Sequence, residues 1–206
     1  MTLVAERVLV KDLGVAAYLP TVAAMREFTA RRDADTPDEL WLLQHPPVYT
    51  LGLAADRAHG PKPSSGIPVE QVERGGEITY HGPGQVVMYT LVDLARRGVK
   101  VKQFVAMLEQ SVIDLLDGRA ERRKGAPGVY VDGAKVAALG IRVSRGRAFH
   151  GLALNVDMDL APFAAIDPCG YPGLRVTQTR DLGFDFTVER AGARLAGILA
   201  RKLEHA

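Results

Sequence analysis

The glycine-rich stretch Arg74-Gly-Gly-Glu-Ile-Thr-Tyr-His-Gly-Pro-Gly-Gln85 joins two β-like segments and constrains the fold more than any other part of the chain. It contains four glycines and one proline within twelve residues. Because glycine lets a ligand approach the main chain closely, neighbouring amides in such a stretch can hold a carbonyl, a carboxylate or a developing oxyanion. The alternative is a tight β-turn with a glycine bulge. The stretch lacks both the Gly-Lys-Ser/Thr ending of a phosphate loop and a Gly-x-Gly-x-x-Gly helix opening, so it gives no support to nucleotide binding by those routes.

The segments on either side of this stretch follow the hydrophobic periodicities of strands and helices. Short apolar runs predict strands at 8–10, 39–45, 48–51, 69–94 with a break at 81–84, 129–131, 134–143 and 148–156. Three- and four-residue spacing predicts helices at 15–31, 99–116 and 187–203. Asp132-Gly133 suits a tight hairpin turn, residues 144–147 predict the next turn, and the segment 54–68, dense in Gly, Pro and Ser, predicts a surface loop. We therefore expect one α/β (α+β) domain over residues 1–206, with mixed β-sheets flanked by helices.

The amino-acid composition and the charge balance narrow the classes of protein to which the chain can belong. The chain has 206 residues, 47% of them apolar and 24% charged, which is ordinary for a globular protein. Its 26 basic and 24 acidic side chains leave a net charge of only +2, so nucleic-acid binding is not expected. A single cysteine cannot form an internal disulfide, and charges interrupt the first 13 residues, so we expect a cytoplasmic protein without a signal peptide. No stretch approaches the roughly 20 apolar residues of a membrane span, so no membrane association is expected.

Cys169 and Lys135 are the candidate catalytic residues. Cys169 lies in Ile166-Asp-Pro-Cys-Gly170, where proline and glycine suit a nucleophile presented from a rigid turn. Its alternative is an inert, buried thiol. Lys135 begins the apolar run Lys-Val-Ala-Ala-Leu-Gly140, and its alternative is an ordinary hairpin lysine that reaches solvent. If the two meet, the ammonium lowers the pKa of the thiol below its free value of about 8.5 and favours the reactive thiolate.

Two histidines and two basic clusters allow more than one interpretation. His81 and His150 each precede a glycine and can lie at strand ends near a pocket, or can be satisfied core histidines. A zinc site that combines them with Cys169 lacks a close Cys-x-x-Cys or His-x-x-x-His pair, so no metal and no other cofactor is expected. Arg122-Arg-Lys124 and the arginines at 142, 145 and 147 place positive charge on predicted loops. They form either a solvated surface or a docking site for an acidic protein.

Taken in order, four motifs resemble those of the lipoyl(octanoyl) transferases, a family within the biotin/lipoyl protein ligase superfamily. The motifs are Arg74 to Gln85, Lys135-Val-Ala-Ala-Leu-Gly-Ile-Arg142, Phe149-His-Gly-Leu-Ala-Leu-Asn-Val156 and Pro168-Cys-Gly170. Each motif alone is modestly specific, whereas the ordered set, which covers about residues 40 to 180, is highly specific. The long loop at 54–68 looks variable, which leaves docking details open.

The resemblance implies a biotin/lipoyl protein ligase-like fold and an octanoyl transfer without a cofactor. The implied donor is octanoyl–acyl carrier protein, and the implied acceptors are lysines of the lipoyl domains of 2-oxoacid dehydrogenase complexes or of the glycine cleavage H protein. Cys169 would carry the octanoyl thioester and Lys135 would tune or deprotonate it. The segments that would line the acyl pocket are Arg74, Gly75, Gly76, Glu77, Ile78, Thr79, Tyr80 and His81, then Ala138, Leu139 and Gly140, then Gly151, Leu152 and Ala153.

Three other functions remain open at this point. An ATP-dependent lipoate or biotin ligase of the same fold would activate a free acid and would need no cysteine nucleophile. A non-catalytic module that binds lipoyl domains or carrier proteins would use the basic residues 122–124 for docking. A thioesterase would release free acid without an acceptor. The chemistry itself favours transfer, because exchange between two thioesters is nearly isoenergetic and the final amide is much more stable.

Overall fold

The computed structural model describes residues 8–55, 60, 66–166 and 174–206. Its elements in chain order are β1 (Leu9–Val15), α1 (Tyr18–Arg31), β2 (Glu39–Gln44), β3 (Val48–Leu51), β4 (Val69–Gln71), β5 (Ile78–His81), β6 (Gln85–Asp93), α2 (Val101–Leu115), β7 (Glu121–Arg123), β8 (Ala126–Val131), β9 (Ala134–Ser144), β10 (Arg147–Asn155), the short 3₁₀ helix η3 (Ala161–Ala165) and α3 (Val188–Glu204). Cys169 and most of the 54–68 loop lie outside the described residues.

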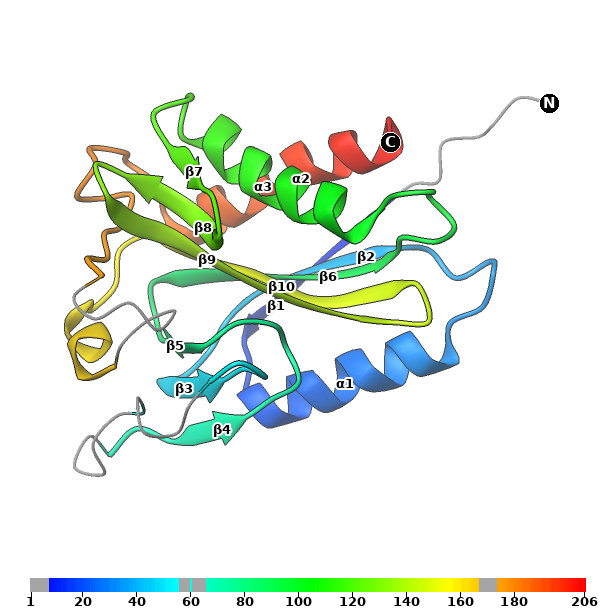
Figure 1. Ribbon diagram of the computed structural model, residues 1–206, viewed down its shortest axis with the longest axis horizontal. Helices are drawn as coiled ribbons and strands as arrows, with labels where there is room; N and C mark the ends of the chain where they lie inside the picture. The colour runs from blue at the N-terminus through cyan, green and yellow to red at the C-terminus, as the bar shows by residue number, and fades with distance from the viewer. Residues whose placement is uncertain (1–7, 56–59, 61–65, 167–173) are drawn as a thin grey trace.

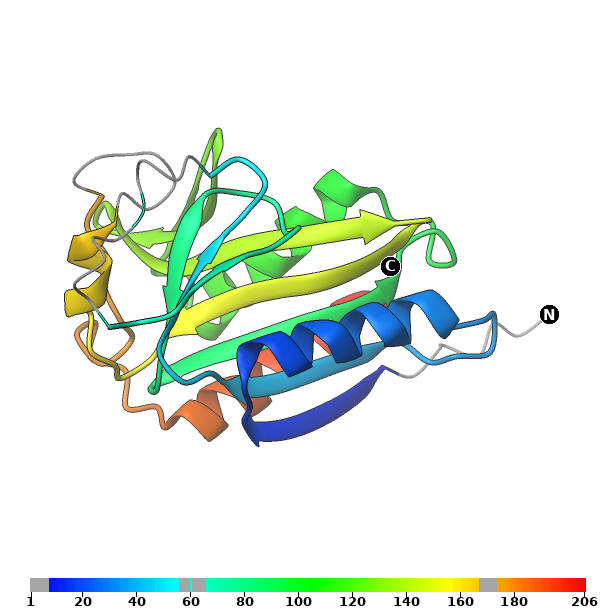
Figure 2. The same cartoon turned by 90° about the horizontal axis from the view of Figure 1, so that it is seen from below.

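Two sheets organise these elements. The larger has seven strands in the order β1-β2-β6-β10-β9-β8-β7, and the smaller has three in the order β4-β3-β5. In the larger sheet β1 runs parallel to β2, and the other neighbours are antiparallel. Helices α2 and α3 cover one face of the large sheet, while α1 and the small sheet lie side by side on the other (Figures 1 and 2). The result is a layered α/β fold, as predicted.

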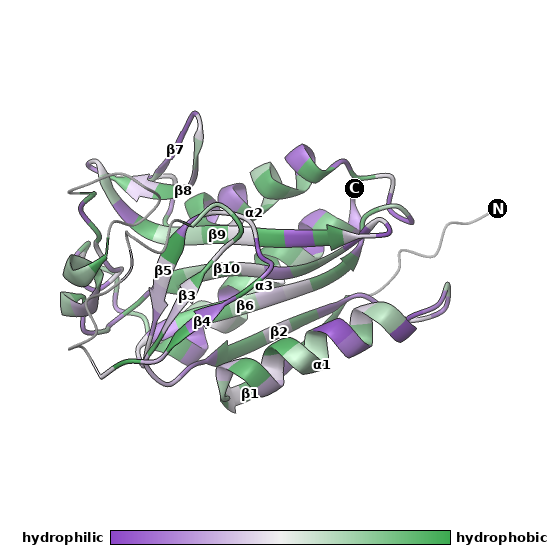
Figure 3. Ribbon diagram, turned by 60° about the horizontal axis from the view of Figure 1, so that its bottom comes forward, coloured by the Kyte–Doolittle hydropathy of each residue, from purple (hydrophilic) through white to green (hydrophobic). Residues whose placement is uncertain are grey.

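Strand alternation supplies both buried faces of the large sheet. In β2, Leu40 and Leu42 pack into the core under α2 and α3, whereas Trp41 and Leu43 pack into the core under α1. Successive strand side chains point to opposite faces, so a strand covered on both sides must be apolar at every position. This explains why β2 and β6 are continuous apolar runs, which Figure 3 shows as mainly green and white ribbon.

The helices follow the predicted pattern with small shifts in their ends. The third helix is capped by Thr187, whose hydroxyl accepts a hydrogen bond from the Arg190 amide at 3.2 Å. Its apolar stripe, which includes Leu195 and Leu199, is completely buried against the sheet. The first helix starts at Tyr18, three positions later than the beginning of the predicted range 15–31, because Leu9–Val15 continues as strand β1.

The Asp132-Gly133 turn was predicted correctly, whereas two short elements were not predicted. Asp132 and Gly133 have φ values of 46° and 81°, which is the left-handed geometry that a tight hairpin requires. Residues 69–94, predicted to be β-like with a break at 81–84, form the three strands β4, β5 and β6, with a further break at 72–77. Residues 121–123, expected in a loop, form the short edge strand β7, and residues 161–165 form η3. These last two elements are too short to give a periodic signal.

One buried carboxylate joins several elements at the far end of the sheet from the small strands. Asp38 forms ion pairs with Arg32 at 2.5 Å, Arg97 at 2.6 Å and Arg96 at 3.1 Å, and it accepts the Asp93 amide at 2.8 Å. Burial alone would raise the pKa of Asp38, but the hydrogen bonds from Asp93, Arg32 and Arg97 outweigh it and lower that pKa. In the described part of the chain, no helix is long and apolar enough to cross a membrane.

Candidate active site

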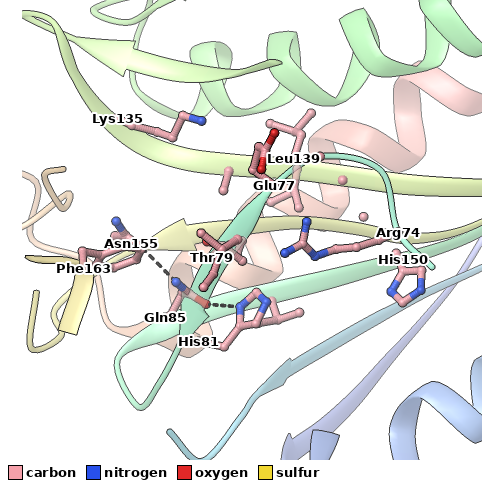
Figure 4. A pocket seen from close by; sticks show the side chains of 18 of the residues that line it. Arg74, Glu77, Thr79, His81, Gln85, Lys135, Leu139, His150, Asn155 and Phe163 are labelled. Carbon is pink, nitrogen blue, oxygen red and sulfur yellow. Dashed lines mark hydrogen bonds between the residues drawn. The ribbon is translucent and has the colours of Figure 1, made fainter. Parts of the chain in front are cut away.

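A cavity lies between the small sheet and the face of the large sheet that α1 also covers (Figure 4). It contains about 770 Å³ of space not filled by atoms, including space open to solvent. The residues that line it are Tyr18, Arg74, Gly76, Glu77, Ile78, Thr79, His81, Gln85, Val87, Tyr89, Lys135, Ala138, Leu139, Gly140, His150, Gly151, Leu152, Ala153, Asn155, Phe163 and Val176. A mostly apolar lining with a few convergent polar groups is typical of a small-molecule or acyl site.

The cavity brings together nearly all of the residues that the sequence suggested for an acyl pocket. The three segments meet because Ala138, Leu139 and Gly140 of β9 pair with Ala153, Leu152 and Gly151 of β10, and the 74–81 segment crosses above them. Gly75 and Tyr80 are the exceptions. Gly75 donates its amide to the Ile141 carbonyl at 3.0 Å, and Tyr80 packs against Tyr49 and Phe163 on the other side of the small sheet.

Lys135 faces the cavity because of an irregularity in β9. The β8–β9 register runs from Val129 opposite Ala137 to Tyr130 opposite Lys135, so β9 carries one extra residue at Val136. Val136 and Ala137 both point into the core under α2 and α3. The bulge thereby moves Lys135 to the same face as Ala138 and Gly140, whereas regular alternation would have placed it in that core.

The Lys135 side chain is buried, which excludes the surface-lysine alternative. Its exposed fraction is 4%, and its ammonium donates to the Pro127 carbonyl at 3.4 Å and lies 5.3 Å from the centre of the Tyr130 ring. Gly128 makes room for it. A Cβ added at Gly128 would lie 2.9 Å from Lys135 Cε and 2.9 Å from the Ala137 carbonyl oxygen, and Gly128 has a φ of 143°. The role of Gly128 was not predictable from the local sequence, because it depends on the opposite strand.

The chain segments on both sides of residues 167–173 lie at the Lys135 end of the cavity. The Lys135 amide donates to the Arg175 carbonyl at 2.8 Å, and the Thr177 amide donates to the Lys135 carbonyl at 2.9 Å. Val176 therefore runs beside β9 and lines the cavity. On the preceding side, Phe163 also lines the cavity and Ile166 packs in the same apolar cluster. Cys169 belongs to the segment between these two anchors and lies outside the described residues.

Arg74 holds the glycine-rich segment in place. Its guanidinium donates to the Thr50 carbonyl at 2.7 Å, to the Thr50 hydroxyl at 2.8 Å and to the Gly75 carbonyl at 2.9 Å. Gly140 lets this segment approach β9, because a Cβ there would lie 2.7 Å from the Gly75 carbonyl oxygen. The guanidinium therefore donates its hydrogen bonds to protein acceptors and connects β3 to the glycine-rich segment above the cavity.

A directed chain of hydrogen bonds fixes the tautomer of His81. Gln85 Nε2 donates to the Tyr80 carbonyl at 3.2 Å and to Asn155 Oδ1 at 3.0 Å, so Gln85 Oε1 is the acceptor for His81 Nδ1 at 2.7 Å (Figure 4). Burial lowers the pKa of His81 to about 3, with a further contribution from His45. The imidazole is thus neutral at pH 7 and leaves Nε2 as a hydrogen-bond acceptor.

The opposite end of the cavity carries a second neutral histidine. His150 has 1% exposure and a left-handed φ of 61°, which costs backbone strain in a residue other than glycine. Neither ring nitrogen has a hydrogen-bond partner within the described part of the chain. Burial lowers its pKa to about 4, so this end of the cavity offers one donor and one acceptor from a neutral imidazole. His150 lies inside strand β10 and not at a strand end, contrary to the sequence expectation.

Within the described ranges, no group of three or more His, Cys, Asp or Glu side chains is arranged to hold a metal ion. Four polar residues also line the cavity, although the sequence did not indicate them as pocket residues: Tyr18, Gln85, Tyr89 and Asn155. Of these, Gln85 is the last residue of the glycine-rich stretch, and Asn155 is the second-to-last residue of the Phe149-to-Val156 motif. Both polar residues lie within motifs that the sequence already singled out, and this was a usable signal for them.

Comparison with known proteins identifies the family. Residues 17–200 match the lipoyl protein ligase A/B catalytic domain. The chain belongs to this family. An octanoyltransferase of Thiobacillus denitrificans is 60% identical over 197 residues, which cover 94% of this chain and 90% of the relative. An octanoyltransferase of Pseudomonas entomophila is 51% identical over 96% of this chain and 93% of the relative. The predicted family and the prediction that the chain is an enzyme are confirmed.

Solved structures of the superfamily share the fold. A Thermoplasma acidophilum protein assigned as a lipoate protein ligase, with bound lipoic acid, superposes with a TM-score of 0.76 at 15% identity and covers 96% of this chain and 86% of its own. A biotin protein ligase from Aquifex aeolicus with biotin and ATP gives a TM-score of 0.58 at 13% identity, with 96% and 70% covered. The predicted biotin/lipoyl protein ligase-like fold is thereby confirmed.

Proposed function

We propose that this enzyme transfers an octanoyl group from octanoyl–acyl carrier protein to a lysine of a lipoyl domain, through a thioester on Cys169. The acceptors are the lipoyl domains of 2-oxoacid dehydrogenase complexes or the glycine cleavage H protein. The names of the relatives support the octanoyl group. The observation that carries the mechanism is the buried Lys135 at the end of an apolar cavity, between the two anchored flanks of the Pro168-Cys-Gly170 motif.

In the first step the Cys169 thiolate attacks the thioester carbonyl of the donor. The Cys169 thiol first gives its proton to the Lys135 amine. The new carbon–sulfur bond forms as the bond to the carrier sulfur breaks, and the carrier thiolate takes that proton from the Lys135 ammonium, which leaves Lys135 as a neutral amine. A thiol is only a few per cent ionised at neutral pH, so a neighbouring ammonium that favours the thiolate raises the reactive fraction. In this scheme the Lys135 ammonium supplies that charge.

In the second step the acceptor amine attacks the Cys169 thioester. The amide bond forms, the bond to sulfur breaks, and the proton of the amine passes through Lys135 to the Cys169 thiolate. A free lysine amine is mostly protonated at neutral pH, with a pKa of about 10.4, so a proton acceptor in the site accelerates this step. Both steps run without ATP, because the acyl group arrives already activated.

The cavity suits the acyl tail of this substrate. Ala138, Leu139 and Leu152 provide an apolar floor, and each buried methylene contributes about 0.8 kcal/mol to binding. The described donors of Arg74 are bound to protein carbonyls and to a hydroxyl, which favours a neutral thioester over a free carboxylate in this position. This arrangement weighs against the ligase alternative.

Intact-protein mass spectrometry after mixing with octanoyl–carrier protein tests the proposal. We expect a single octanoyl adduct on Cys169 that neutral hydroxylamine removes, and no turnover in Cys169→Ser. An adduct on a lysine or serine would overturn the thioester mechanism. Acylation that requires ATP and free octanoate, and that persists in Cys169→Ala, would assign the chain to the ligases. Release of free octanoate without an acceptor would indicate a thioesterase, and binding without any acyl transfer would indicate a docking module.

A further inference from the structure

A second depression lies at the edge of the large sheet, and we call it the edge groove. It is lined by Gly75, Gly76, Glu77, Val105, Gly125, Ala126, Pro127, Leu139, Gly140 and Ile141. Four of these residues, Gly76, Glu77, Leu139 and Gly140, also line the acyl cavity. The groove and the cavity therefore meet along the same stretch of β9.

The edge groove exists because β8 stops pairing before β9 ends. The last register pair of the β8–β9 ladder is Gly128 with Ala138. The preceding residue, Pro127, has no N–H to donate to the facing strand. Further along β9, the Gly75 amide takes over the same edge by bonding the Ile141 carbonyl at 3.0 Å. Between these two points the edge of β9 faces the groove, and an extended chain can lie against it.

The groove reaches the reactive centre. Its lining residue Pro127 supplies the carbonyl that accepts the Lys135 ammonium at 3.4 Å. A ligand that fills both spaces would thus pass the Lys135 ammonium at the junction between them.

Three exposed cations lie close in sequence to residues that line the groove. Lys102 lies one turn before Val105 on α2, Lys124 precedes Gly125, and Arg142 follows Ile141. Within the described part of the chain none of these three cations has an ion pair. The neighbouring Arg122, by contrast, is held against α2 by Glu109 at 3.3 Å and by the Ala106 carbonyl at 2.9 Å.

We propose that the edge groove binds the phosphopantetheine arm of the acyl carrier protein. This inference rests on the proposed function, because it assumes a carrier-bound thioester as the donor. Such a donor is a long chain with its reactive carbonyl in the middle, so it needs two spaces that meet at the nucleophile. The apolar octanoyl tail enters the acyl cavity. The arm, which carries two amides, lies along the open edge of β9, and its phosphate reaches Lys102, Lys124 and Arg142.

The test compares three octanoyl donors: the carrier protein, coenzyme A and N-acetylcysteamine, of which the last has no phosphate. Lys102→Gln/Lys124→Gln/Arg142→Gln removes the three cations. The matched control, Arg145→Gln/Arg190→Gln/Arg201→Gln, removes three cations from the β9–β10 turn and α3, outside the groove. We expect kcat/KM for both phosphate-bearing donors to fall about 10-fold, the change produced by losing three exposed ion pairs of about 0.5 kcal/mol each. The rate with N-acetylcysteamine should stay within about twofold.

A steric variant tests the groove independently of charge. Val105→Trp fills the outer part of the groove from α2, and its control, Val101→Trp, adds the same side chain one turn earlier at a position that is 46% exposed. We expect only Val105→Trp to raise KM for the carrier-protein donor. Circular dichroism and hydroxylamine-sensitive acylation by octanoyl–N-acetylcysteamine confirm that each variant is folded and reactive.

Specific outcomes overturn the inference. An equal loss of kcat/KM with all three donors would indicate a structural effect. An unchanged kcat/KM with every donor would show that the phosphate does not bind these three cations. A higher KM for the lipoyl-domain acceptor, with an unchanged KM for the donor, would assign the groove to the acceptor. A wild-type kcat/KM higher for octanoyl–coenzyme A than for the carrier donor would assign the arm to coenzyme A. If no donor acylates the wild-type enzyme, the proposed function itself fails, which is a distinguishable result.

Discussion

Replacing Lys135 with methionine separates the catalytic role of this residue from any role in stability. Methionine keeps the volume of the side-chain stem and removes the charge and the proton acceptor. The substitution abolishes a long hydrogen bond to Pro127, which contributes about 0.5 kcal/mol, and the cation–π interaction with the Tyr130 ring, which contributes about 0.5–2 kcal/mol. In the other direction, it removes the desolvation penalty of a buried charge, which is several kcal/mol.

The two contributions oppose each other, so we expect little change in the free energy of unfolding. A net change of about 1.5 kcal/mol or less in either direction corresponds to a shift in Tm of no more than about 6 °C for a chain of this size. Acylation of Cys169 and amide formation should each fall by roughly 10²–10⁴-fold, the usual contribution of a positioned acid–base group. Lys11→Met is the control, because Lys11 is a half-exposed lysine on the edge strand β1.

The assay measures Tm, hydroxylamine-sensitive acylation and the pH dependence of Cys169 alkylation by iodoacetamide. Alkylation at pH 7 should be slower in Lys135→Met, because less thiolate is present. Lys135→Arg should recover part of the alkylation rate through its charge but not amide formation, since arginine does not release its proton. Superimposable alkylation profiles together with normal turnover would refute the role assigned to Lys135.

Other perturbations test the buried carboxylate, the depth of the cavity and the neutral histidines. Asp38→Asn should lower the free energy of unfolding by about 3–5 kcal/mol in urea titrations, because it removes the carboxylate that neutralises buried arginines, whereas turnover per folded molecule should persist; a loss under 1 kcal/mol would contradict the ion-pair account. Ala138→Leu should shorten the acyl cavity and lower the ratio of kcat/KM for octanoyl over hexanoyl donors by up to about 15-fold, the equivalent of the two methylenes by which these donors differ; an unchanged ratio would place the acyl tail elsewhere. Burial lowers the pKa of His45 and His150 to about 4 and of His81 to about 3, against about 6.5 when unfolded, so the unfolded chain binds more protons below pH 6.5. Stability should therefore be full above pH 6.5 and fall by about 1.4 kcal/mol per pH unit for each histidine toward pH 4, and a Tm that is flat from pH 7 to 4.5 would contradict these shifts.

The sequence by itself determined the features that depend on neighbouring residues. Apolar periodicity predicted the three α-helices and most strands, because side-chain direction repeats every 3.6 residues in a helix and every two in a strand. The Asp132-Gly133 turn was predictable because both residues tolerate positive φ. The ordered motifs predicted the family and nearly all of the cavity-lining segments. The catalytic use of Cys169 and Lys135 stays a prediction from those motifs.

Tertiary structure decided the features that depend on pairing between distant segments. The bulge at Val136 turns Lys135 toward the cavity, and it is defined only by the register of β9 against β8. Three other features also depend on residues from different strands. They are the space at Gly128 that accommodates the Lys135 side chain, the hydrogen bond from Gln85 to Asn155, and the unpaired edge of β9 between Pro127 and Gly75. The local sequence sets which conformations each segment can adopt. Long-range backbone pairing and close packing then select one register of the strands, and that register places the Lys135 side chain in the cavity.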